Sequence, residues 1–197
     1  MRKKSISYIV AALLGAVTFP ALAQGLLAGD ARTACEAILC LSSGQRPDQC
    51  TPPLQRYFSI SYRRITDTLR GRMDFLKLCP AASQDANMNA LVNDIANGAG
   101  RCDAASLNSS STVMQGNSDG GYTFYVGNVM PGYCSSYLQN AYTNLKNTMA
   151  MYVGVPERGG FWVAPGEFTA AQAAYNATIA AQDEAAAQAA LLNNYGS

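Results

Sequence analysis

The sequence predicts a mostly α-helical, disulfide-stapled domain with a small β excursion or long loop near residues 103–133. Apolar residues spaced three and four apart between Leu54 and Leu76 predict a long helix, and an alanine-rich segment at 170–190 predicts another. Six cysteines in a chain without histidine predict the disulfide bonds. These observations predict a helical frame that is cross-linked rather than built around a metal.

The N-terminus has the pattern of a secretory signal peptide. Residues 2–4 are basic, residues 9–19 form an apolar run, and Ala21-Leu22-Ala23 resembles a cleavage site. We expect cleavage after Ala23 and a periplasmic mature protein. The apolar run is too short to span a bilayer, so we expect no stable membrane insertion after cleavage.

The remaining chain is expected to form one domain over residues 24–153, followed by a Gly/Pro connector and an Ala-rich helix within residues 154–197. Removing residues 1–23 takes away three basic side chains and leaves 11 Lys and Arg against 13 Asp and Glu. This near-neutral balance gives no reason to expect nucleic acid as a partner.

All the cysteines follow the predicted cleavage site, and an even number of cysteines in an oxidising compartment is typical of disulfides. Zinc sites usually need closer cysteine pairs or histidine, so we expect neither a metal nor a cofactor. We expect three bonds among Cys35, Cys40, Cys50, Cys79, Cys102 and Cys134.

The first two helices are expected to meet at a corner. The first runs from about residue 33 to residue 41, and Ser42-Ser43-Gly44 ends it. Thr51-Pro52-Pro53 starts the second, which the apolar spacing extends over residues 53–78. Because Cys40 ends one helix and Cys50 precedes the other, we expect a Cys40–Cys50 bond across the corner.

The other two bonds follow from a straight second helix. At 1.5 Å per residue it would span about 39 Å and hold Cys79 away from Cys35. We therefore expect Cys79–Cys102 at the base of a helical hairpin. Cys35–Cys134 would then join the N-terminal helix to the later part of the chain.

The charges of the 53–78 helix allow two interpretations. One is a solvated ladder of alternating charges, and the other is a partner-docking face on which Arg64 and Arg72 are not neutralised. The ladder interpretation uses Arg63, Asp67, Arg70, Asp74 and Lys77.

The rest of the chain is expected to form three helices and two strand-like segments. A short return helix over residues 88–97 is followed by strand-like segments at 112–115 and 122–129, for which a long polar loop is the alternative. Residues 135–153 should form another helix. The alanine-rich tail helix should dock weakly, through Phe168, Tyr175, Ile179, Leu191 and Leu192.

The composition argues against an enzyme. Without histidine, Ser-His-Asp and Cys-His sites cannot form, and no C-x-x-C pair or phosphate-binding glycine loop is present. A carboxylate pair acting on peptidoglycan is the enzymatic alternative, drawn from Glu36, Glu157 and Glu167. We expect no catalytic residues.

Three stretches carry a family resemblance. "CEAILCLSSG", "RPDQCTPPLQRYFSI" and "FLKLCP", at residues 35–44, 46–60 and 75–80, lie behind a signal peptide. Together they resemble the TrbM/KikA/MpfK family of conjugal transfer proteins. The resemblance implies a periplasmic accessory of mating-pair formation that works with protein components of a type IV secretion apparatus. It implies no catalytic residues, and an exported binding or inhibitor protein is the alternative from the residues alone.

Overall fold

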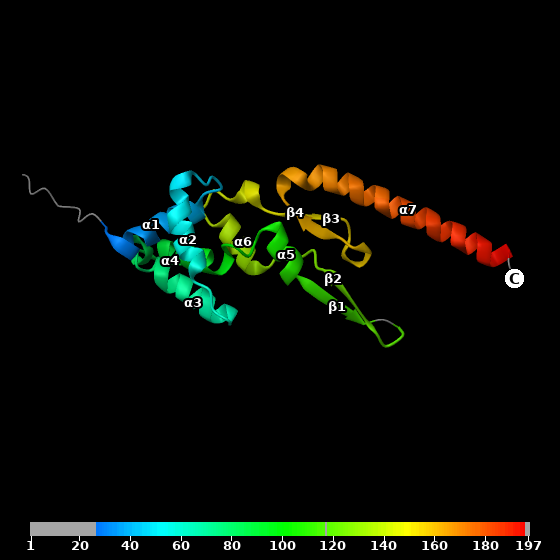
Figure 1. Ribbon diagram of the computed structural model, residues 1–197, viewed down its shortest axis with the longest axis horizontal. Coiled ribbons are helices and arrows are strands. Elements are labelled where there is room, and N and C mark those ends of the chain that lie inside the picture. The colour runs from blue at the N-terminus through cyan, green and yellow to red at the C-terminus, as the bar shows by residue number, and fades with distance from the viewer. Residues whose placement is uncertain (1–26, 117, 196–197) are drawn as a thin grey trace, which may run out of the picture.

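The computed structural model describes residues 27–116 and 118–195, so the predicted signal peptide lies outside the described residues. The predicted fold class is confirmed: helices dominate, and two small antiparallel hairpins accompany them (Figure 1). In the described part of the chain, no helix is both long and apolar enough to cross a membrane.

The first two helices form the expected corner. α1 covers Gly29–Ser42 and α2 covers Thr51–Ser59, with prolines in the first turn of α2. The Cys40–Cys50 bond is confirmed, with 5.6 Å between the two Cα atoms. It closes the loop between the helices at the point where both enter the core.

The single long helix predicted over residues 53–78 is wrong, because the chain turns between α2 and α3 (Ile65–Leu76). Ile60 and Arg64 have extended backbone conformations. Thr68, which is buried, satisfies polar groups of this turn: its hydroxyl accepts from the Tyr62 N–H at 2.8 Å and lies 3.2 Å from the Tyr62 carbonyl oxygen. Arg72 Nε donates to the Ile60 carbonyl at 3.2 Å.

This turn explains why two of the three predicted disulfides are wrong. After it, α3 returns towards α1 and forms a Cys35–Cys79 bond with 4.9 Å between the Cα atoms. Cys102 therefore bonds to Cys134, at 5.4 Å between Cα atoms, instead of to Cys79. The described part of the chain contains no free cysteine.

The core lies between α1, α2, α3, α4 (Ala86–Gly98) and α6 (Gly132–Gln139). Two buried tyrosines connect these helices, since Tyr57 donates to the Ile95 carbonyl and Tyr137 donates to the Leu41 carbonyl at 2.6 Å. Burial raises the pKa of Tyr137 to about 12, because the phenolate form would lose its hydration.

The helix predicted over residues 135–153 is wrong beyond Gln139. Asn140 leaves the helical conformation, accepts from the Tyr142 N–H through Oδ1, and donates through Nδ2 to Asp94 at 2.7 Å. The chain then passes Asn144, which forms a β-bridge with Ser43, and a short 3-10 helix, η3 (Lys146–Thr148), before it enters β3 (Met151–Val153). β3 pairs with β4 (Phe161–Val163), which lies within the predicted connector.

The β excursion is confirmed as a hairpin that follows α5 (Ala104–Ser110). β1 covers Thr112–Gly116 and β2 covers Tyr122–Val126. Figure 1 shows this hairpin and the tail helix α7 (Phe168–Tyr195) projecting from the helical body. Of the expected tail anchors, Phe168, Tyr175 and Ile179 are half-buried, whereas Leu191 and Leu192 are exposed.

Candidate protein-interaction surface

The base of the β1–β2 hairpin is fixed to the body by side chains from three other segments. Trp162 is buried, and its indole N–H donates to the Gly127 carbonyl at 2.9 Å. Asn108 of α5 exchanges two hydrogen bonds with the backbone of Trp162. The Tyr152 hydroxyl donates to the Val126 carbonyl at 2.6 Å. These bonds set the direction in which the hairpin leaves the body.

The two faces of the hairpin have different surroundings. Alternation along the paired strands places Met114 opposite Phe124 on one face, with Tyr122 two residues away on the same face. Their exposed fractions are 58%, 64% and 63%. We call Met114, Tyr122 and Phe124 the apolar hairpin face. Asp119 is the one charged residue between residues 111 and 129, so charge does not interrupt this surface.

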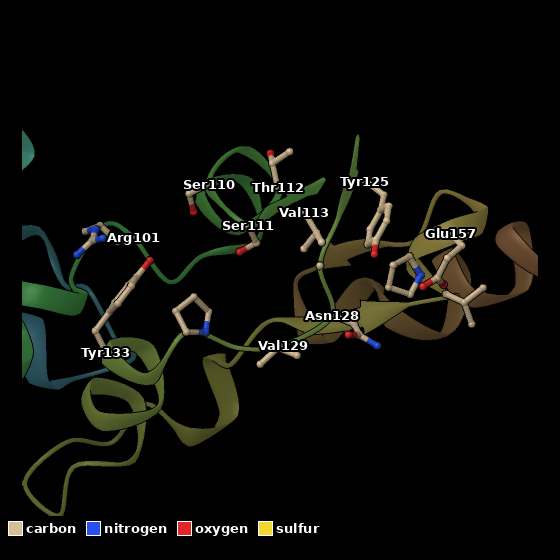
Figure 2. A pocket seen from close by; sticks show the side chains of 14 residues that line it. Arg101, Ser110, Ser111, Thr112, Val113, Tyr125, Asn128, Val129, Tyr133 and Glu157 are labelled. Carbon is tan, nitrogen blue, oxygen red and sulfur yellow. The ribbon is translucent and has the colours of Figure 1, made fainter. Parts of the chain in front are cut away.

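The opposite face borders a cavity of about 810 Å³. Figure 2 shows its lining: Val113 and Tyr125 come from the hairpin, Arg101 and Tyr133 lie at one end, and Glu157 lies at the other. Positive and negative side chains therefore occupy opposite ends of one opening. Its middle is lined by hydroxyl and apolar groups.

Arg101 is held in place at its end of the cavity. Its guanidinium lies 4.0 Å from the centre of the Tyr133 ring and donates to the Asn97 carbonyl at 2.8 Å. Nearby, the Ser111 hydroxyl is buried and has no hydrogen-bond partner among the described residues. The cavity therefore presents a positively charged guanidinium in a fixed position to any ligand. It also contains a hydroxyl group, that of Ser111, without a hydrogen-bond partner among the described residues.

Asp103, just after Cys102, caps the helix that leads to the hairpin. Burial opposes ionisation of its carboxyl group, but hydrogen bonds from the Ser106 N–H and hydroxyl outweigh that effect and lower the pKa of Asp103. The ionised carboxylate therefore favours the start of α5, whose far end carries β1.

Arg64 and Arg72 do not have the same exposure, so they do not form a pair of equally accessible cations. Arg72 is half-buried, and its guanidinium lies 5.0 Å from the centre of the Tyr57 ring and 5.2 Å from that of Phe58. Arg64 is exposed at the start of α3. Docking through these two residues stays a prediction.

The charged ladder predicted beside them does not form ion pairs. The ion pairs among the described residues are Arg32–Glu36, Arg56–Asp30 and Arg158–Asp183. The turn between α2 and α3 places Arg63 outside the helix, which breaks the predicted spacing.

The three glutamates considered for catalysis lie on different elements. Glu36 pairs with Arg32 on α1, Glu157 lines the cavity, and Glu167 is exposed just before α7. Over residues 27–116 and 118–195, no group of three His, Cys, Asp or Glu side chains could hold a metal ion.

Sequence reasoning did not identify the apolar hairpin face or the cavity. The strand-like composition of residues 112–129 was visible, and the alternation of Tyr122 and Phe124 with Thr123 could have indicated an apolar face. No local pattern could have indicated the cavity, because its lining is drawn from residues 101 to 157.

A scan against protein-family models finds a match to the TrbM family over residues 26–176. This range includes the six cysteines, the hairpin and the first nine residues of α7. No curated protein and no solved structure matches the chain.

Proposed function

Because the chain belongs to the TrbM family, we propose that it is a periplasmic accessory or assembly protein of a conjugative type IV secretion system. In this proposal it acts by binding protein components of the apparatus and performs no catalysis. The family relation supports a link to conjugal transfer. Three disulfides support export, since such bonds persist in oxidising compartments.

The observation that carries the binding role is the apolar hairpin face. Three large apolar side chains, Met114, Tyr122 and Phe124, are each more than half exposed on one face of a short sheet. Contiguous apolar surface on a soluble protein commonly marks an interaction site, and aromatic residues are favoured at the centres of such sites. The hydrogen bonds at Trp162 hold this face away from the core, where a large partner can reach it.

Deletion and complementation in donor cells test the conjugative role. Removal of the coding sequence should lower the frequency of transfer, and a wild-type copy should restore it. A copy that lacks residues 1–23 should fail to restore transfer, because its product would stay in the cytoplasm. Unchanged transfer with normal pili after deletion would contradict the proposal.

The cavity supports a second candidate, an exported binding or inhibitor protein unrelated to conjugation. Its volume of about 810 Å³ lies within the usual range for small-molecule sites, and Arg101 offers a fixed cation. A soluble anion that raises the melting temperature of the wild type, but not of Arg101→Ala, would favour this candidate. This candidate also requires that deletion of the coding sequence leave the frequency of conjugal transfer unchanged.

A further inference from the structure

The outer edge of β1 exposes backbone groups that a further strand could use. The Gly127 N–H donates to the Ser111 carbonyl at 2.7 Å, so these residues form a hydrogen-bonded pair at the base of the hairpin. In an antiparallel ladder such pairs alternate with pairs that are not hydrogen-bonded. The N–H and C=O groups of Thr112, Met114 and Gly116 therefore point away from β2.

The corresponding edge of β2 is closed at its base. The same alternation points the Val126 carbonyl outward, and there it accepts the hydrogen bond from Tyr152. Figure 1 shows β2, not β1, on the side of β3 and β4. Among the described residues, the outward backbone groups of Thr112, Met114 and Gly116 have no hydrogen-bond partner.

β1 also lacks the usual protection of an edge strand. Monomeric proteins commonly place lysine, proline or a bulge on such an edge. The sequence of β1 is Thr-Val-Met-Gln-Gly, with no charge and no proline, and its register with β2 is regular over all five residues. The strand is therefore open to pairing with another chain.

We propose that β1 pairs with β1 of a second copy of this chain, antiparallel about a two-fold axis at Met114. The three outward-facing residues are centred on Met114, so this register is complementary to itself. Met114 faces Met114 of the second copy, and Thr112 faces Gly116. Every outward N–H and C=O of the strand then has a partner.

The side chains fit the same arrangement. Met114 and Phe124 are cross-strand neighbours, so the two-fold axis extends them into one apolar row across a four-stranded sheet. No like charges meet, because β1 and β2 carry no charged residue. The row also enlarges the apolar hairpin face. The proposed pairing does not depend on a role in conjugation.

The pairing is expected to be weak. A five-residue strand contributes far less than the roughly 1,200–2,000 Å² that stable protein interfaces bury. The dimer should therefore dissociate on dilution.

Cysteine cross-linking of the purified mature protein tests the register. The Cα atoms of a hydrogen-bonded antiparallel pair lie about 5.5 Å apart, within the reach of a disulfide. Met114→Cys should therefore give a covalent dimer on a non-reducing gel under mild oxidation. Gln115→Cys is the matched control, because its counterpart lies two residues out of register, at roughly 8 Å.

A second pair of variants tests the association without new thiols. Sedimentation equilibrium should show a concentration-dependent dimer for the wild type and for Gln115→Lys. Met114→Lys should be monomeric, since two ammonium groups would meet at the axis. Both substitutions lie on an exposed strand, so neither places a charge in the core. Mass spectrometry should find the three native disulfides in both variants, which confirms that they fold.

The proposal is overturned if Met114→Cys gives no covalent dimer, or no more than Gln115→Cys gives. It is also overturned if Met114→Lys and the wild type sediment alike. The proposal is overturned as well if the purified chain is monomeric and Met114→Cys, expressed in donor cells, cross-links to a different periplasmic protein, because the edge of β1 would then bind that protein.

Discussion

Arg72 is expected to stabilise the fold, and its replacement separates a structural role from partner docking. Its Nε donates to the Ile60 carbonyl within the turn between α2 and α3, and its guanidinium lies over the rings of Tyr57 and Phe58. Arg72→Ala removes the hydrogen bond, both ring contacts and the packing of the side-chain stem. Arg64→Ala is the matched control, because Arg64 is an exposed arginine at the N-cap of the same helix, α3.

The size of the effect follows from these contacts. Each cation–π contact contributes about 0.5–1 kcal/mol and the hydrogen bond about 1 kcal/mol, so Arg72→Ala should lower the free energy of unfolding by about 2–3 kcal/mol. Arg64→Ala should change it by less than about 0.5 kcal/mol. Arg72→Lys should recover only part of the loss, because an ammonium group cannot stack as a guanidinium does.

Urea unfolding of the three oxidised variants measures these differences. A loss for Arg72→Ala no greater than for Arg64→Ala would refute the reasoning, because the turn would then not depend on Arg72. If transfer fell with Arg64→Ala while its stability stayed normal, Arg64 would act at a docking surface.

Three further predictions concern the core and the tail. Gly98→Ala should destabilise the protein by about 1–3 kcal/mol in chemical unfolding, because the added Cβ would lie too close to Tyr137. Gly71→Ala should cost less, because its Cβ would meet side-chain atoms of the exposed Tyr62 and the half-buried Ile60, which can shift. Equal losses would contradict this. Stability should fall as pH rises from about 10 towards 12, by about 1.4 kcal/mol per pH unit for Tyr137, because the unfolded tyrosine ionises first. Alkaline unfolding should be shallower for Tyr137→Phe, and an unchanged slope would argue against it. Amide hydrogens of residues 184–193 should exchange much faster than those of α4, because these residues are exposed; comparable protection would mean that the tail packs against something.

Local signals predicted the start of α2 and the hairpin. Thr51-Pro52-Pro53 begins α2, and the strand-like residues near 112–129 pair as a hairpin. The Cys40–Cys50 bond followed from the short loop between two recognisable helices. Each of these features depends on residues that lie no more than 14 positions apart in the sequence.

The turn between α2 and α3 could not be read in the same way. Tyr62 and Ile65 continue the apolar spacing through it, yet both are exposed in the structure. Tertiary contacts decide the outcome. The Tyr62 N–H in the turn donates to the Thr68 hydroxyl, and Arg72 donates to the Ile60 carbonyl. The turn lets Phe75 and Leu76 enter the core. The straight-helix assumption then produced both incorrect disulfides.

The helix expected over residues 135–153 failed for a related reason. The apolar spacing there is real, but the Asn140 side chain forms a local turn and reaches Asp94 on α4. The cavity could not be predicted from the sequence. Its two charged ends, Arg101 and Glu157, are far apart in the chain, and only folding brings them to the same opening.

The most direct test of the central claim is the frequency of transfer from donors that carry a Met114→Ser, Phe124→Ser variant in place of the wild type. Both residues are exposed, so the variant should be exported and oxidised normally, and equal amounts of periplasmic protein should be verified. Leu39→Ser, at an exposed position on α1, is the control. The account predicts that transfer falls towards the deletion level for the hairpin variant and stays normal for Leu39→Ser. Normal transfer with the hairpin variant would contradict the claim that this protein acts through the apolar hairpin face.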